Sequence, residues 1–179
     1  MILLSDTRQQ AGKHVLKEKY FAEHGIEIRR TKLYTGDYTL PTDQSVCVDT
    51  KKDIQELISD ICGKSHERFR DECIRAHESN IQLIILVENK DGVKEIRDLF
   101  EWQNPRRKIY KNSDQVIGYW KSGNRRYKRV QKYPGATKGE TLAKACLTMQ
   151  LKYGVSFQFC RPDESGARIL QLLGVDVDG

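Results

Sequence analysis

An almost continuous apolar run, Ile81-Gln-Leu-Ile-Ile-Leu-Val87, constrains the fold of this chain more than any other stretch. Polar residues bound it on both sides, and Glu88 follows it directly. A run of this length suits a strand, and a strand that is apolar on both faces belongs in the centre of a sheet covered by helices on both sides. The stretch therefore predicts a central strand between two layers of helices.

Helical and strand patterns alternate around this run. Strands are expected over 2–5, 26–33 and 155–160, and helices over 13–24, 54–61, 65–79, 93–102, 138–153 and 164–173. The clearest helix has Ile54, Leu57 and Ile61 at helical spacing, and Gly63 ends it. Strands that alternate with helices predict an α/β sandwich with a mixed central sheet.

A β-hairpin is expected near the end of the first quarter of the chain. Pro and Asp in 41–44 predict a turn, and the β-rich residues 45–51 predict the second strand. Because side chains alternate along a strand, Asp49 and Lys51 share one face, and Asp37 lies across the hairpin. The alternative is a solvated ion pair at a sheet edge, which contributes little to stability.

Two carboxylates beside a lysine suit metal-assisted hydrolysis of a phosphodiester. Asp37 and Asp49 are expected to hold Mg²⁺ or Mn²⁺ with the backbone carbonyl of Thr50, since hard cations take one or two carboxylates and otherwise keep water. The ion would polarise the phosphate and activate its water, and Lys51 would orient that water or stabilise negative charge. Asp6, at the end of the first strand, would complete the metal's surroundings or position a second ion.

Three further residues are secondary candidates for the site. Arg8 could contact phosphate or pair with a neighbouring acid. Glu72 could face the site from the second helix or remain solvated, and Glu88 could support the site from the end of the apolar strand.

Charge is concentrated in one segment. The chain carries +6, but residues 104–133 hold ten lysines and arginines against Asp114 alone, a net +9, so the rest of the chain carries −3. This distribution is typical of a nucleic-acid binder. With too few apolar residues for its own core, the segment is expected to be an insertion or extended loop at about 104–138 within one domain spanning 1–179. The candidate DNA-binding residues are Arg106, Arg107, Lys108, Trp120, Arg125, Arg126, Lys128 and Arg129.

The interleaved aromatic residues of this segment suit stacking on unpaired bases. The alternative is a disordered basic arm with no specific role.

The five cysteines form no Cys-x-x-Cys pair, the N-terminus lacks a signal peptide, and no apolar run can span a bilayer. We therefore expect a cytoplasmic or nucleoid-associated protein that is not secreted and has no membrane partner.

Several short motifs resemble the ERCC4-type (XPF/Mus81-like) nuclease domain, a branch of the PD-(D/E)xK restriction-endonuclease-like superfamily. They are Asp6-Thr7-Arg8-Gln9, Gly36-Asp37-Tyr38, Asp49-Thr50-Lys51, Phe69–Ala76, Leu86-Val87-Glu88 and Gly166–Leu170. The resemblance implies a restriction-endonuclease-like mixed sheet and a metal-dependent endonuclease that acts on branched, flapped or single-strand-containing DNA. It also implies that the domain can pair as a homodimer.

The chain departs from the family pattern at four positions. Asp49 stands where the family has Glu, Thr50 where it has Arg and Gln9 where it has Glu. Gln55 stands where the family has Asp, unless a one-residue shift puts Glu56 there. The metal-binding acids are kept, so an active enzyme is expected. Two alternatives stay open: a DNA-binding module of the same fold without catalysis, and a junction-resolving or restriction-type nuclease.

Overall fold

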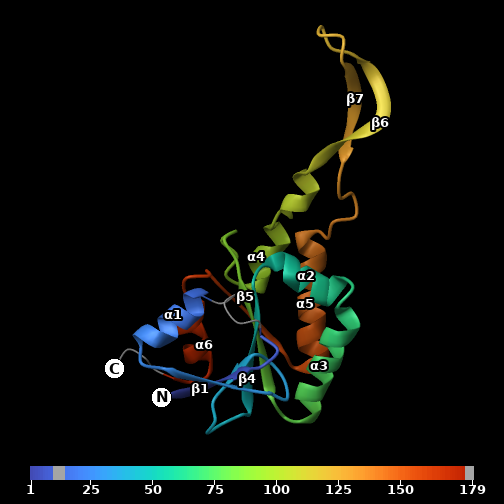
Figure 1. Cartoon of the computed structure of the whole chain (residues 1–179). Coiled ribbons are helices and arrows are strands. Elements are labelled where there is room, and N and C mark those ends of the chain that lie inside the picture. The colour runs from blue at the N-terminus through green and yellow to red at the C-terminus, as the bar shows by residue number, and fades with distance from the viewer. Residues whose placement is uncertain (10–14, 176–179) are drawn as a thin grey trace.

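A mixed sheet of six strands, in the order β2-β1-β3-β4-β5-β8, forms the centre of the computed structural model, which describes residues 1–9 and 15–175 (Figure 1). The strands are β1 (Ile2–Asp6), β2 (Glu27–Thr31), β3 (Tyr38–Thr39), β4 (Val46–Lys51), β5 (Gln82–Glu88) and β8 (Ser156–Cys160). The short β3 runs antiparallel to β1 and β4, and all other neighbours are parallel. The predicted fold class is confirmed.

Helices cover both faces of the sheet. They are α1 (Val15–Glu23), α2 (Ile54–Cys62), α3 (His66–Glu78), α4 (Ile96–Glu101), α5 (Gly139–Tyr153) and α6 (Ser165–Leu172). Each matches a predicted helix, although residues 13 and 14 of the first prediction lie outside the described residues. The helix predicted over 93–102 is shorter because Glu95 and Asp98 cap each other's backbone and start α4 at Ile96.

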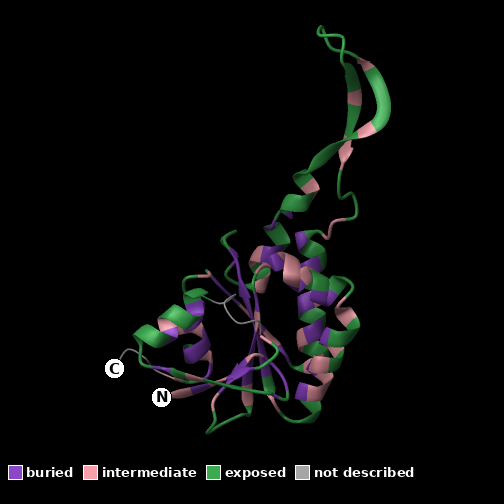
Figure 2. Ribbon diagram, in the orientation of Figure 1, coloured by how far each residue is buried: buried purple, intermediate pink, exposed green. Residues whose placement is uncertain are grey.

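The apolar run is the central strand that its sequence predicts. β5 lies between β4 and β8, and its side chains enter two hydrophobic cores. Leu83, Ile85 and Val87 pack under α2, α3, α4 and α5, whereas Ile84 and Leu86 pack under α1 and α6. Figure 2 shows this buried sheet between helices whose outer sides are exposed. None of the helices in the described ranges is long and apolar enough to cross a membrane.

The basic insertion is more regular than the extended loop expected from the sequence. After a 3₁₀ turn at Pro105–Lys108, β6 (Tyr110–Tyr119) and β7 (Arg125–Gln131) form an antiparallel hairpin. This hairpin projects away from the sheet, beyond α4 and α5 (Figure 1). We call residues 104–138 the arm. Its side chains are largely exposed, as the green ribbon in Figure 2 shows.

Candidate active site

A buried lysine lies between two buried aspartates beneath α2. Asp49 and Lys51 point to the same face of β4, and the Lys51 Nζ atom is 2.7 Å from Asp49 Oδ2. The same Nζ atom is 2.8 Å from Oδ2 of Asp60 on α2 and 5.0 Å from the centre of the Phe69 ring. All three charged side chains are less than a tenth exposed. Such a group is stable only because the ammonium compensates both carboxylates.

Asp37 reaches the same end of β4 from the other strand of the hairpin. Tyr38 is paired with Val48, so the antiparallel register brings Asp37 level with Asp49. Asp37 Oδ2 accepts hydrogen bonds from the Thr50 backbone N–H at 2.8 Å and from Thr50 Oγ1 at 2.6 Å. The N–H and C=O of one strand residue point to the same side, so the Thr50 carbonyl also faces Asp37.

Burial and the neighbouring charges shift the pKa values of the site residues. Burial raises the pKa of Asp49 to about 7; Lys51 opposes this rise, whereas the nearby charges of Asp37 and Glu72 add to it. Burial alone would lower the pKa of Lys51, but Asp49 and Asp60 outweigh burial and raise it. The raised pKa favours the protonated form of Lys51, which suits the orientation or stabilisation of anionic groups.

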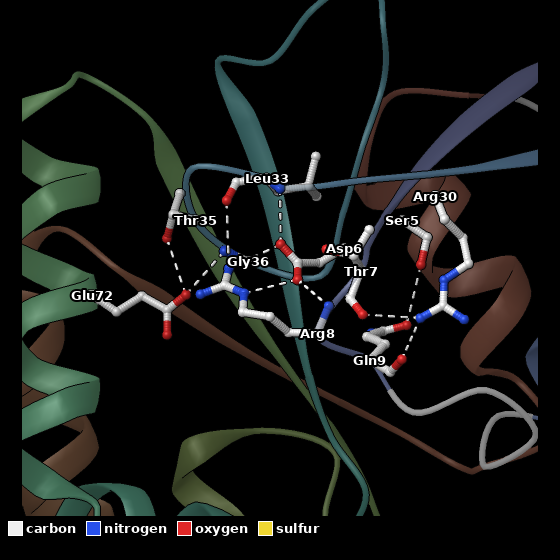
Figure 3. Close-up of polar contacts among 10 residues, drawn as sticks. All are labelled: Ser5, Asp6, Thr7, Arg8, Gln9, Arg30, Leu33, Thr35, Gly36 and Glu72. Carbon is white, nitrogen blue, oxygen red and sulfur yellow. Dashed lines mark hydrogen bonds and ion pairs between the residues drawn. The ribbon is translucent and has the colours of Figure 1, made fainter.

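Glu72 holds the turn that precedes Asp37. Its Oε1 atom accepts hydrogen bonds from the Gly36 backbone N–H at 3.1 Å and from Thr35 Oγ1 at 3.3 Å (Figure 3). Gly36 has a positive φ of 70°, and a Cβ there would lie 3.1 Å from the Cβ of Cys47. The turn therefore favours glycine, and α3 fixes its position through Glu72.

Both carboxylate oxygens of Asp6 accept hydrogen bonds from neighbouring residues. It accepts hydrogen bonds from the Arg8 backbone N–H at 2.6 Å, from Arg8 Nε and Nη2 at 2.8 and 2.9 Å, and from the Leu33 backbone N–H at 2.9 Å (Figure 3). Burial raises the pKa of Asp6, but these bonds outweigh burial and hold it below its ordinary value. With both oxygens occupied, Asp6 positions Arg8 in this structure.

Arg8 lies beside the carboxylates and is accessible. Its side chain is 57% exposed, and its guanidinium is close enough to Glu72 and Asp37 for their charges to contribute to its raised pKa, after the larger effect of Asp6. Figure 3 shows the guanidinium between Asp6 and Glu72. An exposed, oriented guanidinium at this point is well suited to contact a phosphate.

The structure does not bring Glu88 to this group. Glu88 follows Val87 on β5 and points to the opposite face of the sheet, where it forms a buried ion pair with Lys17 of α1. Asp49 and Lys51 face α2 and α3 instead. Lys51 pairs with Val87 and shares its face of the sheet. Glu88 is the next residue of β5 and points to the other face, because successive residues of a strand point to opposite faces.

The residues at β4 fit a divalent ion with few protein ligands. Within residues 1–9 and 15–175, no group of three or more His, Cys, Asp and Glu side chains has the geometry of a metal centre. Mg²⁺ often binds through only one or two carboxylates and keeps several waters. Asp37, Asp49 and the Thr50 carbonyl supply such a set, and the buried Asp49 Oδ2 also contacts Lys51 Nζ at 2.7 Å.

Two functional contacts were not anticipated from the sequence. Asp60 lies three residues after the buried Leu57, on the apolar face of α2. An acid on that face was the feature of the sequence that could have indicated a buried charge. Gln55 on α2 donates from Nε2 to Oδ1 of Asn104 at 2.9 Å, which links α2 to the arm. No local pattern marks this second contact.

The proposed DNA-binding residues line the arm, and aromatic rings lie among them. Arg126 lies 5.2 Å from the ring centre of Trp120, and Arg129 lies 5.8 Å from that of Tyr110. Trp120 is 58% exposed. These cations and rings are thus presented to solvent on one ribbon, the combination that binds phosphates and stacks on bases.

Comparisons with known proteins identify the family and the fold of this chain. Residues 5–173 match the family described as the ERCC4 domain. A search of curated proteins found no match. XPF from Aeropyrum pernix has a similar structure, with a TM-score of 0.57 and 15% identity over 97% of this chain and 60% of that chain. XPF from Aeropyrum pernix in complex with DNA gives a TM-score of 0.58 and 17% identity over 97% and 63%.

The mixed sheet and its flanking helices thus define an XPF-like nuclease fold. The chain belongs to the ERCC4 domain family, whose members are typically nucleases that depend on a metal ion. It spans about 60% of the length of the XPF chains that it resembles.

Proposed function

We propose that this chain is a Mg²⁺- or Mn²⁺-dependent endonuclease that hydrolyses phosphodiester bonds in branched, flapped or partly single-stranded DNA. The observation that carries this proposal is the meeting of Asp37, Asp49 and the Thr50 carbonyl beside the buried ammonium of Lys51. Membership of a family whose members are typically nucleases supports the same reaction class.

Each residue has a distinct role in this proposal. Asp37 and Asp49 hold the ion with the Thr50 carbonyl, and a bound divalent ion supplies an activated water and a polarised phosphate. Lys51 orients the water and stabilises the charge that develops on the phosphate oxygens. Arg8, held by Asp6, binds a phosphate next to the scissile one.

Asp60 is a positioning residue for Lys51. Since Lys51 lies between two carboxylates, it can keep its contact with Asp60 when a metal ion neutralises Asp49. The ammonium then stays beside the phosphate without a new buried charge being left unpaired. This role is compatible with Thr50 in place of the family's Arg, since Lys51 still provides a fixed positive charge.

The arm is the proposed DNA-binding surface. Its net charge of +10 favours phosphate contacts, and its exposed rings favour unpaired bases. A similar fold occurs in XPF from Aeropyrum pernix in complex with DNA, which supports DNA as the partner. Pairing with a second copy of the chain remains part of the proposal, and sedimentation velocity at several concentrations tests it.

A cleavage panel tests the proposal. End-labelled flap, fork, four-way junction and linear duplex are incubated with the protein and Mg²⁺, Mn²⁺ or a chelator. We expect incision of the flap and fork with either metal and none with the chelator. Asp49→Asn removes the activity, whereas Asp163→Asn, on an exposed loop, serves as the matched control.

The alternatives give different results in the same panel. Tight DNA binding without incision, unchanged by Asp49→Asn, would identify a non-catalytic binding module. Preferential cutting of the four-way junction would identify a junction-resolving nuclease, and cutting of linear duplex at one sequence a restriction-type nuclease.

A further inference from the structure

A buried asparagine joins the arm to the helix of the candidate active site. Asn104 is 2% exposed. Its Oδ1 atom accepts hydrogen bonds from Gln55 Nε2 at 2.9 Å and from the Arg106 backbone N–H at 3.0 Å, and its Nδ2 atom donates to the Thr137 carbonyl at 2.8 Å. One side chain therefore ties the two ends of the arm to each other and to α2.

α2 is held close to the catalytic strand. It begins at Ile54, three residues after Lys51, and Asp53 caps its first turn by accepting from the Glu56 backbone N–H at 2.7 Å. Asp60 on the same helix contacts Lys51. Because Gln55 lies in this first turn, its bond to Asn104 fixes the arm relative to the residues that would hold the metal.

Other contacts stiffen the proximal end of the arm. Arg107 Nη1 donates to the Ala136 carbonyl at 3.0 Å, and Gln131 Nε2 donates to the Arg107 carbonyl at 2.7 Å. Gly139, at the start of α5, packs against α4 so closely that a Cβ there would lie 2.2 Å from the Leu99 carbonyl oxygen. The arm is thus attached by a packed and hydrogen-bonded joint.

The length of the arm sets a distance. β6 pairs with β7 from Tyr110–Gln131 to Tyr119–Arg125, and β7 covers this span in seven residues, so at roughly 3.3 Å per residue the ribbon is about 20 Å long. Since B-DNA rises about 3.4 Å per base pair, this length equals about six base pairs. The tip carries Tyr119 and Trp120, which are 69% and 58% exposed. A two-stranded ribbon also has the width that a major groove admits.

We propose that the Asn104–Gln55 contact makes the arm a spacer of fixed length, so that the preferred substrate carries at least about six base pairs of duplex beside the cleavage point. The incision then falls at a set distance from the DNA that the arm grips. This proposal rests on the proposed nuclease function and names the part of the substrate that this site requires. Gln55 stands where the family has an acid, and its hydrogen bond to Asn104 gives this difference from the family a structural reason.

Duplex DNA fits the arm better than a second copy of the chain. Arms that paired with each other would bring two segments of net charge +10 together. Cations also follow both faces of β7, since Arg125 and Arg129 alternate with Arg126 and Lys128. A polyanion can neutralise both faces at once as it surrounds the ribbon.

A duplex-length series tests the spacer. Flap substrates with duplex from about four to about twenty base pairs are compared for cleavage and binding. We expect cleavage to rise at least tenfold once the duplex exceeds about six base pairs and then to level off. Replacing residues 107–132 with a short Gly-Ser linker removes this dependence. The proposal would be overturned if cleavage still depended on duplex length after the arm is removed, or if cleavage by the complete chain never varied with duplex length.

Gln55→Ala tests the joint. We expect this variant to keep the melting temperature and the salt dependence of DNA binding but to spread its cuts over several neighbouring positions. Gln103→Ala, at an exposed neighbouring glutamine, is the matched control and cuts as the unaltered chain does. Cuts by Gln55→Ala at the original single position would contradict the fixed spacer.

Hydroxyl-radical footprinting separates this inference from the proposed function. If the protein binds DNA without cutting it, the footprint of the complete chain still extends about six base pairs beyond that of the arm-deleted chain. Equal footprints would overturn the spacer regardless of catalysis. A change from dimer to monomer in sedimentation on arm deletion, with unchanged DNA affinity, would show that the arm binds protein instead.

Discussion

The two charged regions of this protein are built in opposite ways. At the end of β4, each buried charge has assigned partners: Lys51 has Asp49 and Asp60, and Asp6 has Arg8. On the arm, many charges are exposed on a two-stranded ribbon, and several of them lie beside aromatic rings. The site uses few groups in fixed positions, whereas the arm uses many groups of one sign.

This difference predicts how each region responds to change. A buried charge that loses its partner remains desolvated, so a single substitution at the site has a large effect. Exposed charges are already hydrated and screened, so each contributes little and their sum matters. Substitutions that alter one region and leave the other intact can test this contrast.

The largest effect is expected for Asp37→Asn. The substitution keeps an oxygen that can accept from Thr50 but removes the negative charge from the proposed metal site. Cleavage of a flap substrate should fall by roughly 10²–10³-fold, the usual effect of removing one preorganised electrostatic group. Asp43→Asn, an exposed site on the same hairpin, is the control and should retain full activity. Equal losses of cleavage activity in the two variants would contradict the difference proposed between buried and exposed charges.

Asp60→Asn should lower stability and activity together. Lys51 would keep only Asp49 as a charged partner, and loss of a buried partner costs about 3 kcal/mol in the free energy of unfolding. Urea denaturation without metal measures this change. Asp71→Asn, an exposed site on α3, is the matched control. A stability equal to that of the control would mean that Asp60 does not hold Lys51.

Asp6→Asn should weaken the protein by about 2 kcal/mol, since hydrogen bonds to a charged group are lost. Because the pKa of Asp6 is lower in the folded state than its ordinary value of 3.8, its contribution is complete above that pH and is lost as the pH falls through the folded value. The stability difference between Asp6→Asn and the unaltered chain should therefore shrink in acid. A difference that stays constant from neutral to strongly acidic pH would contradict this role.

The smallest effect per residue is expected on the arm. Replacing Arg125, Arg126, Lys128 and Arg129 with Ser should reduce the slope of log affinity against log salt by about 3 to 4 and leave thermal stability unchanged. A control with the same change in charge replaces four exposed cations of the body, Lys19, Arg29, Lys144 and Arg161. Equal slopes in the two variants would show that the arm has no special role in DNA binding.

Local sequence patterns account for most of the fold and for part of the site. The apolar run predicted β5, and alternation placed Asp49 and Lys51 on one face with Asp37 across the hairpin. The regular hairpin of the arm escaped prediction because its register shifts between Asn112 and Gly118 interrupt the alternation of period two.

The remaining contacts depend on packing between distant elements. Asp60 meets Lys51 only because α2 folds back over β4, and Gln55 meets Asn104 across 49 positions of sequence. Glu88 and Asp6 were candidates because each lies at a strand end. Their partners, Lys17 and Arg8, are set by tertiary structure and by the local turn respectively.

Mn²⁺ binding measured by electron paramagnetic resonance tests the central claim most directly, because it requires neither DNA nor turnover. Titration of the unaltered chain and of Asp49→Asn compares the bound ion in each. The account predicts one bound Mn²⁺ per unaltered chain and loss of that ion in Asp49→Asn, with Asp6→Asn still binding. Undiminished binding by Asp49→Asn would contradict the assignment of the metal to the end of β4.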